Sequence, residues 1–161
     1  SDTHGFLDEQ VLQHFNNCDE IWHAGDWGTM EVVTILNSLE GKRLKGVYGN
    51  IDGQDLRSLY PEQLVFHCEE VKVLIRHIGG YPPRYNPATK KELQQHRPQL
   101  FISGHSHILK VMYDEPLQCL HMNPGAAGKQ GWHQMRTVLR FVIDGANIRD
   151  LEVIELGKRS G

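Results

Sequence analysis

Cysteine, positive charge and long apolar runs are all scarce in this 161-residue chain, and each scarcity excludes a class of protein. The three cysteines are scattered and show no C-x-x-C spacing; they are Cys18, Cys68 and Cys119. This spacing argues against a disulfide scaffold or a zinc knuckle, and it predicts free thiols in a reducing compartment, so we expect a cytoplasmic protein. No apolar run is long enough to cross a bilayer.

The charge balance excludes further partners. Lysine and arginine together number 17 against 20 acidic residues, which gives a net charge of -3. A nucleic-acid or anionic-membrane surface needs concentrated positive charge, so we expect no membrane partner and no strong nucleic-acid binding. Length and a 39% hydrophobic share predict one globular domain over residues 1–161. Oligomeric state stays open, a homo-oligomer included.

Apolar periodicity predicts an α/β fold. Residues 7–16 and 29–40 show the helical period, and apolar strands lie in "EIWHAGD" and "RLKGVYGN". The alternation of strand and helix predicts a parallel sheet with helices packed on it. The second half is richer in strands, around one helix in "NPATKKELQQH". Its last two strands flank the turn signal Asp144–Gly145, so we expect an antiparallel tail.

Polar residues beside glycine stand at the ends of several expected strands. They are Asp2 and His4 in "SDTHG", Asp26 in "HAGDW", Asn50 and Asp52 in "YGNIDG", His77 in "IRHIGG", and His105 and His107 in "SGHSH". In α/β sheets, sites assemble where the carboxyl ends of strands leave the sheet, and glycine allows sharp turns and close approach there. We therefore expect these side chains to converge.

The ligand types indicate a pair of metal ions. Aspartate, asparagine and histidine without cysteine suit manganese, iron, zinc, nickel or cobalt. Two close ions need a shared carboxylate, and Asp26 is the natural bridge because it lies between the two groups in sequence. Such ions sit about 3.5–4 Å apart and share a water whose pKa falls toward neutrality, which gives a hydroxide for in-line attack on phosphorus.

The ordered set D-x-H, G-D, G-N-x-D, H and G-H-x-H resembles the calcineurin-like metallophosphoesterase superfamily. More narrowly, it resembles the small bacterial and archaeal phosphodiesterases related to the retromer subunit VPS twenty-nine. "NPGAAG" at 123–128 is similar to that branch's N-P-G-S loop, with Ala126 in place of serine. The resemblance covers almost the whole chain and implies an αββα fold, a two-sheet β-sandwich flanked by helices.

The resemblance also implies roles for the residues. Asp2, His4 and His107 would hold the first ion, Asn50, His77 and His105 would hold the second, and Asp26 would bridge them. Asp26, Asn50 and His105 would form the catalytic part around the activated water. The implied activity is a metal-dependent phosphodiesterase acting on a small phosphorylated substrate, with two divalent ions, manganese first among them.

Three features depart from the family pattern. Position 51 is Ile51, where the family often has a histidine that assists the leaving group, so slow turnover or a preference for good leaving groups is expected. Ile78 follows His77 in place of glycine. No strand precedes Asp2, so we expect a truncated first strand and an Asp2 on a mobile terminus that would hold its ion weakly.

Plainer interpretations stand beside these. Single strand-end aspartates are often turn formers or caps, and His77 could be a satisfied core histidine. His23 is expected to pack or to support the ligands, Asp52 to orient one, and Trp27 to lie in the core or line the pocket. Surface or packing positions are expected for the other histidines, which are His14, His67, His96, His121 and His133.

Two rival functions remain open. One is a non-catalytic or weakly catalytic metal-binding scaffold for a protein partner, and the other is a phosphomonoesterase.

Overall fold

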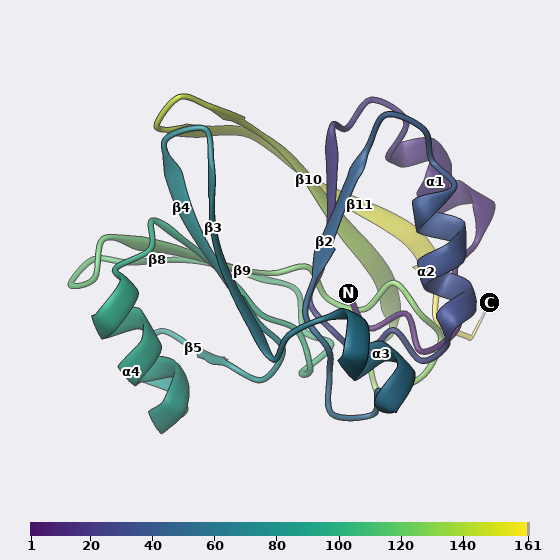
Figure 1. Cartoon of the computed structure of the whole chain (residues 1–161), viewed down its shortest axis with the longest axis horizontal. Coiled ribbons are helices and arrows are strands. Elements are labelled where there is room, and N and C mark those ends of the chain that lie inside the picture. Colours follow the sequence, from purple (N-terminus) through teal and green to yellow (C-terminus); the bar gives the residue numbers. More distant parts are fainter. Residues whose placement is uncertain (161) are drawn as a thin grey trace.

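The computed structural model describes residues 1–160, which form two β layers between helices (Figure 1). The first layer holds two small sheets, one parallel and one antiparallel. Their strands are β1 (Glu20–His23) with β2 (Arg43–Gly46), and β10 (Met135–Asp144) with β11 (Asn147–Lys158). The predicted parallel start and antiparallel tail are both confirmed.

The first residues of the chain join these two sheets. The Asp2 amide donates to the Gly25 carbonyl at 3.0 Å, and the Asp2 carbonyl accepts from the Gly128 amide at 3.1 Å. The side chain of Asp2 is fully buried. The predicted mobile position of Asp2 is therefore wrong, because its backbone is hydrogen-bonded on both sides.

The second layer is one five-stranded sheet in the order β3-β4-β7-β9-β8. Its strands are β3 (Gln63–Cys68), β4 (Val71–Arg76), β7 (Leu100–Ile102), β8 (Lys110–Asp114) and β9 (Cys119–Asn123). The three central strands run parallel, while β3 and β8 pair antiparallel at the edges. The parallel strands therefore point their carboxyl ends the same way, which is the condition for a shared site.

The apolar core explains the layering. Buried side chains such as Ala24, Ile75 and Met122 fill the space between the two layers. Helices α1 (Glu9–His14), α2 (Met30–Asn37) and α3 (Gln54–Leu59) cover the first layer, and α4 (Pro87–His96) covers the second. The predicted two-sheet sandwich flanked by helices is confirmed.

Several element predictions were incomplete. Helices α1 and α2 are shorter than the predicted 7–16 and 29–40, because Asp8 and Thr29 are the extended N-cap residues and the chain leaves the helix after His14 and Asn37. The sequence reasoning missed α3, which is only six residues long. It also missed the two-residue strands β5 (Gly80–Tyr81) and β6 (Arg84–Tyr85).

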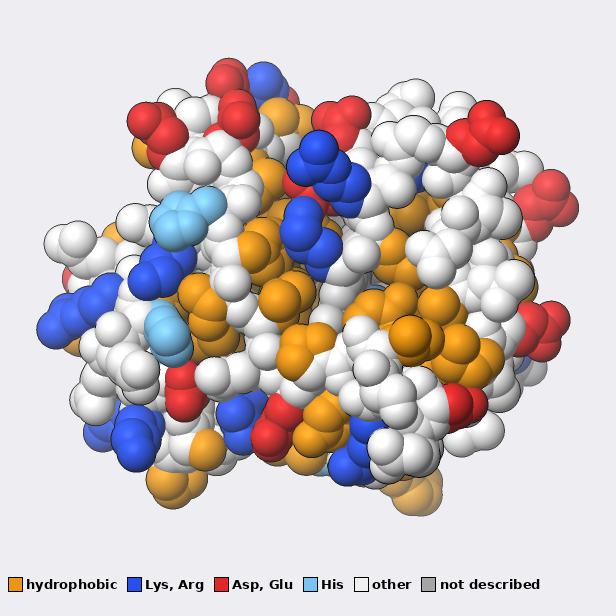
Figure 2. Space-filling model, in the orientation of Figure 1, with side chains coloured by type: hydrophobic (Ala, Val, Ile, Leu, Met, Phe, Trp, Pro, Cys, Tyr) orange, Lys and Arg blue, Asp and Glu red, His pale blue; other side chains and the backbone are white. Residues whose placement is uncertain are grey.

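On one face of the molecule, apolar and acidic side chains occupy different places, while several lysines and arginines lie among the apolar ones (Figure 2). In Figure 2 the apolar side chains gather in the middle of this face, and many of the acidic ones line its upper and right-hand rim. All three cysteines are free thiols, as predicted, and Cys119 is buried. None of the helices within residues 1–160 is both long and apolar enough to cross a membrane.

Candidate metal centre

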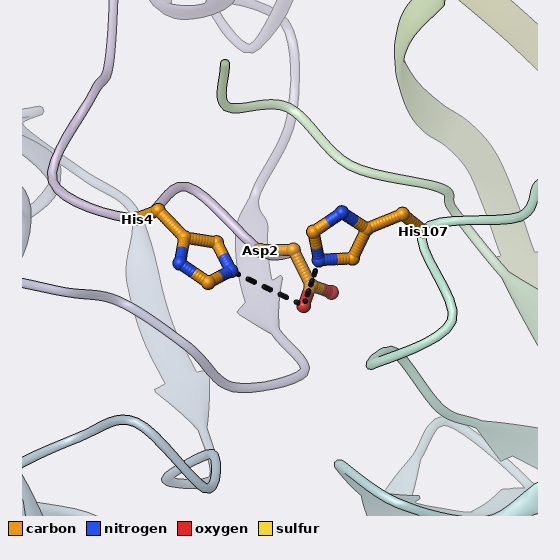
Figure 3. A group of neighbouring side chains, drawn as sticks. All are labelled: Asp2, His4 and His107. Carbon is orange, nitrogen blue, oxygen red and sulfur yellow. Dashed lines mark ion pairs between the residues drawn. The ribbon is translucent and has the colours of Figure 1, made fainter. Parts of the chain in front are cut away.

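Two compact groups of ligand side chains form at the strand ends. The first contains Asp2, His4 and His107, and one ligand atom from each lies within 4.8 Å of the others. In Figure 3 the two imidazoles approach the carboxylate of Asp2 from opposite sides. The Nε2 atom of His107 lies 3.1 Å from Oδ1 of Asp2, and the Nε2 atom of His4 lies 3.9 Å from it.

The second group contains Asp26, His77 and His105, again within 4.8 Å of one another. Asn50 joins this group, since its Oδ1 lies 3.0 Å from Nε2 of His77 and 3.0 Å from Nδ1 of His105. The His77 side chain is buried, but its Nε2 points at Asn50 and Asp26. The structure thus places His77 among the ligand groups, despite Ile78 in place of glycine.

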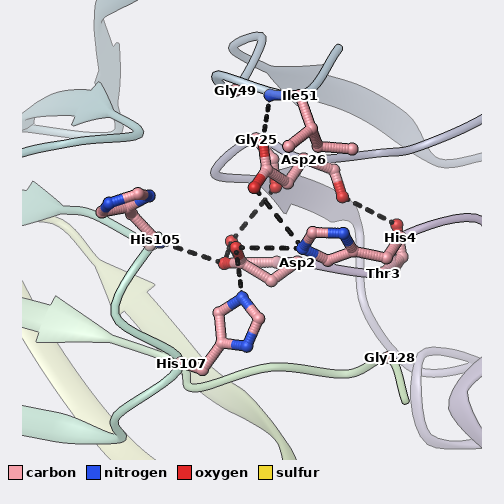
Figure 4. A network of polar contacts seen from close by, with 12 residues as sticks. Asp2, Thr3, His4, Gly25, Asp26, Gly49, Ile51, His105, His107 and Gly128 are labelled. Atoms are coloured by element: carbon pink, nitrogen blue, oxygen red, sulfur yellow. Dashed lines mark hydrogen bonds and ion pairs between the residues drawn. The ribbon is translucent and has the colours of Figure 1, made fainter. Parts of the chain in front are cut away.

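Asp26 lies between the two groups. Its Oδ2 is 3.4 Å from Nε2 of His4 in the first group and 3.2 Å from Nε2 of His77 in the second. Its Oδ1 accepts a hydrogen bond from the Ile51 amide at 3.1 Å (Figure 4). One carboxylate therefore reaches both groups, as a bridging ligand must.

Two buried polar atoms of the centre are unsatisfied. Neither Oδ1 of Asp2 nor Nε2 of His4 makes a hydrogen bond of acceptable geometry with any described residue. Native proteins leave few such atoms unpaired, because each costs its full desolvation penalty. A cation would satisfy both atoms at once. The donor set of carboxylate, amide and imidazole atoms fits a pair of borderline divalent ions.

The hydrogen bonds of His77 direct a lone pair into the centre. Its Nδ1 lies 2.7 Å from the carbonyl of Ala24, which can only accept, so Nδ1 carries the proton. In the neutral ring, Nε2 therefore carries a lone pair. This lone pair points toward the side-chain oxygens of Asp26 and Asn50, which are acceptors themselves. Metal-binding histidines are commonly oriented in this way by a backbone carbonyl.

His133 gives His107 the same orientation, which the sequence reasoning missed. The Nε2 of His133 donates to the Gly128 carbonyl at 2.9 Å, and burial lowers the pKa of His133, which favours its neutral form. Its Nδ1 therefore accepts from Nδ1 of His107 at 3.2 Å. In a neutral His107 ring, the lone pair of Nε2 would then be available to a metal ion held in the first ligand group. Nothing in the spacing of the motifs marks His133.

Replacing His133 by Ala is expected to weaken manganese binding by about 10–100-fold, since His107 loses the partner that fixes its ring. His133→Gln retains an acceptor and should recover most of the affinity. Calorimetric titration with Mn²⁺ measures both, with the exposed His67→Ala as the control variant. Equal affinities for wild type and His133→Ala would show that His133 does not position His107.

The backbone of the centre is strained at most of its ligands. Five of the seven occupy the left-handed region, which costs a non-glycine residue free energy. They are Asp2 (φ 54°), His4 (φ 48°), Asp26 (φ 60°), His105 (φ 71°) and His107 (φ 61°). Such outliers persist where the surrounding structure over-determines them, and they concentrate at functional sites.

Asp52 holds the Asp26 loop in place. Its buried carboxylate accepts from the amides of Asp26 (3.0 Å), Trp27 (3.2 Å), Gly28 (3.0 Å) and Gly49 (2.8 Å). Gly49 is required at this point, because a Cβ there would lie 2.0 Å from Oδ1 of Asp26. The structure thus places Asp52 in the orienting position that the sequence predicted for it.

The carboxylates make the centre strongly negative. Burial alone raises the pKa of Asp2, but contact with His107 and the charge of His77 outweigh it and hold that pKa below its usual range. Burial lowers the pKa of His77, but Asp26 and Asp2 outweigh it and raise that pKa. The same potential that favours a proton on His77 would favour a metal ion in its place.

Two further aromatic residues lie behind the ligands. His23 is buried, contacts Thr3 Oγ1 through Nε2 at 3.0 Å, and stacks on Trp27 at 3.9 Å between ring centroids. Trp27 is fully buried and its Nε1 donates to the Val47 carbonyl. Trp27 is therefore a packing residue that does not line the pocket, while His23 packs and also accepts from the Gly25 amide at 3.0 Å, next to Asp26.

Comparison with known proteins agrees with this geometry. A family model described as the calcineurin-like phosphoesterase superfamily domain matches residues 1–146. A protein of Methanocaldococcus jannaschii described as a probable metallophosphoesterase is 28% identical over 132 residues. The match covers 78% of this chain and 65% of that protein, so the chain spans less than two thirds of this relative.

Solved structures share the fold. Vps29 of Chaetomium thermophilum superposes with a TM-score of 0.73 at 13% identity, over 95% of this chain and 90% of that one. Vps29 of Entamoeba histolytica, complexed with zinc, gives 0.70 at 15% identity over 95% and 90% of the chains. A protein described as a novel archaeal phosphodiesterase gives 0.70 at 18% identity over 91% and 90%. At these identities the likeness concerns the fold.

Proposed function

The chain belongs to the calcineurin-like phosphoesterase superfamily, and from this premise we propose that it is a metal-dependent phosphodiesterase. The observation that carries the proposal is the pair of buried, unsatisfied ligand atoms on Asp2 and His4, beside a carboxylate, Asp26, that reaches both ligand groups. Asp2, His4 and His107 would hold one ion, Asn50, His77 and His105 the other, and Asp26 both.

Two divalent ions bound there would supply a water of near-neutral pKa, ready for in-line attack, and would offset the charge of the phosphate. Asn50 and His105 are the exposed members of the set, so they mark the side from which substrate enters. Manganese is our first choice of ion, with iron, zinc, nickel and cobalt as alternatives. The free thiols support a cytoplasmic setting.

Ile51 supports a preference for good leaving groups. Its backbone amide binds Asp26, but its side chain is 48% exposed and carries no proton to donate. The absence of an acid at this position costs about 10²–10⁴-fold for a poor leaving group. An activated aryl diester should therefore be a far better substrate than an alkyl diester.

The test is hydrolysis of bis(p-nitrophenyl) phosphate by chelator-stripped protein with added Mn²⁺. We expect turnover that requires the metal and that exceeds the rate with p-nitrophenyl phosphate, the matched monoester. Faster monoester hydrolysis would make the protein a phosphomonoesterase instead. Absence of turnover with manganese, nickel, cobalt and iron alike would contradict the proposal.

The second candidate is a metal-binding scaffold that turns over slowly or not at all. The specific observation in its favour is that exposed apolar residues adjoin residues of the centre in the sequence: Ile51 follows Asn50, Ile108 follows His107, and Trp132, which is 99% exposed, precedes His133. Exposed apolar patches commonly mark interaction sites. Full metal occupancy without hydrolysis of any diester would favour this scaffold.

A further inference from the structure

Two cavities flank the second ligand group. One has a volume of about 560 Å³ and includes Asn50 and His77 in its wall. The other has a volume of about 390 Å³ and includes His105. Ile78 and Asn86 line both. A phosphodiester held at the ligand group therefore has space on either side for its two ester groups.

In the larger cavity the charged groups already have partners. The Nε of Arg57 donates to the Asp52 carbonyl at 2.7 Å, and its guanidinium lies 4.5 Å from the ring centroid of Tyr48. Arg76 forms an ion pair with Glu62 at 3.2 Å. These contacts stabilise the wall of the cavity, and both of its arginines, Arg57 and Arg76, already have protein partners.

The smaller cavity is different, because its wall contains a buried histidine whose Nδ1 has no hydrogen-bond partner in the described part of the chain. His121 on β9 is 1% exposed, and its Nδ1 makes no hydrogen bond within residues 1–160. Burial lowers the pKa of His121 to about 4 and outweighs the opposite effect of its contact with the Phe101 backbone, so the ring is neutral at physiological pH. A neutral imidazole offers one donor and one acceptor. Buried groups of this kind are rarely left unpaired.

The rest of this cavity suits a flat ring on an anionic molecule. The side chains of Ile78 and Ile108 are 41% and 60% exposed and give apolar walls. The Lys110 ammonium lies 3.7 Å from the ring centroid of Tyr81, and the exposed Arg84 adds a second positive charge. Apolar walls with a few placed polar groups are typical of small-molecule sites.

We propose that the cavity lined by His121, Ile78, Ile108 and Tyr81 binds one ester group of the substrate, and that this group is a planar ring with a hydrogen-bonding edge, as in a nucleobase. The apolar walls hold the faces of the ring, and His121 pairs with its polar edge. This inference rests on the proposed phosphodiesterase function and names the substrate class of the same site.

The test compares three diesters that share a p-nitrophenolate leaving group and differ in the other ester group, which is methyl, phenyl or thymidine 5′-linked. With Mn²⁺ we expect kcat/KM to rise about tenfold from methyl to phenyl and about tenfold again to thymidine. His121→Phe should abolish only the second step, and Ile108→Ala only the first. Val142→Ala, an exposed aliphatic on β10, is the matched control and should keep both steps.

A binding experiment separates this inference from the proposed function. Phenylphosphonate and methylphosphonate are not hydrolysed, and we expect the phenyl compound to bind about tenfold more tightly and to shift the backbone amide signals of Ile108 and Lys110. Hydrolysis of all three diesters at equal kcat/KM would overturn the ring site and leave the phosphodiesterase standing. If none of the three diesters is hydrolysed but phenylphosphonate still binds more tightly than methylphosphonate, the proposed phosphodiesterase function is wrong and the ring site is supported. If His121→Phe fails to fold, the surface variant Ile108→Ala still decides.

Discussion

Asp26→Asn is expected to lose both metal binding and hydrolysis, with a fall in kcat of more than about 100-fold. Loss of a hydrogen-bond partner behind a metal ligand already costs about 10–100-fold, so loss of the carboxylate that reaches both groups costs more. Asparagine is the informative replacement, because Asp26 has a φ of 60° and asparagine tolerates this left-handed conformation. Alanine would add backbone strain and confuse the interpretation.

Elemental analysis of the purified variant measures the metal, and hydrolysis of bis(p-nitrophenyl) phosphate measures the rate. Asparagine preserves the oxygen that accepts from the Ile51 amide, so the fold and the thermal unfolding of the metal-free protein should change little. Asp19→Ala, at an exposed position, controls for the loss of an aspartate. Two bound manganese ions and a wild-type rate in Asp26→Asn would exclude a bridging role.

Residue types and glycine spacing were enough to predict which side chains would meet. The sequence placed Asp26, Asn50, His77 and His105 after apolar strands, and the parallel strands bring those ends together. Gly25 illustrates the physical reason, because its φ is +105° and a Cβ there would lie 2.6 Å from Nδ1 of His77. Glycine beside a polar strand end therefore signalled close approach between distant segments.

Other parts of the centre had no such signal. His133 lies in the loop after β9, and its contact with His107 depends on the path of that loop. His121 lies inside an apolar strand, where a histidine gives the same pattern whether or not its ring has a partner. The short helix α3 spans six residues and buries a single side chain, Leu56, so no apolar repeat marks it as helical. These features depend on tertiary contacts, which local sequence patterns do not contain.

Asp52→Ala is expected to lower the free energy of unfolding by at least about 4 kcal/mol, because four backbone amides lose their acceptor and each unpaired buried group costs about 1–3 kcal/mol. Urea denaturation of the metal-free protein measures the change. Asp52→Asn is the graded variant: Oδ2 serves three of the four amides, so an amide oxygen placed there keeps three bonds and loses only the one from Gly28. Its cost should be about 1–3 kcal/mol.

Glu31→Ala, at an exposed position on α2, should change stability by less than about 0.5 kcal/mol. If Asp52→Ala proved as stable as Glu31→Ala, the Asp26 loop would not depend on this carboxylate, and the order of the centre would need another cause.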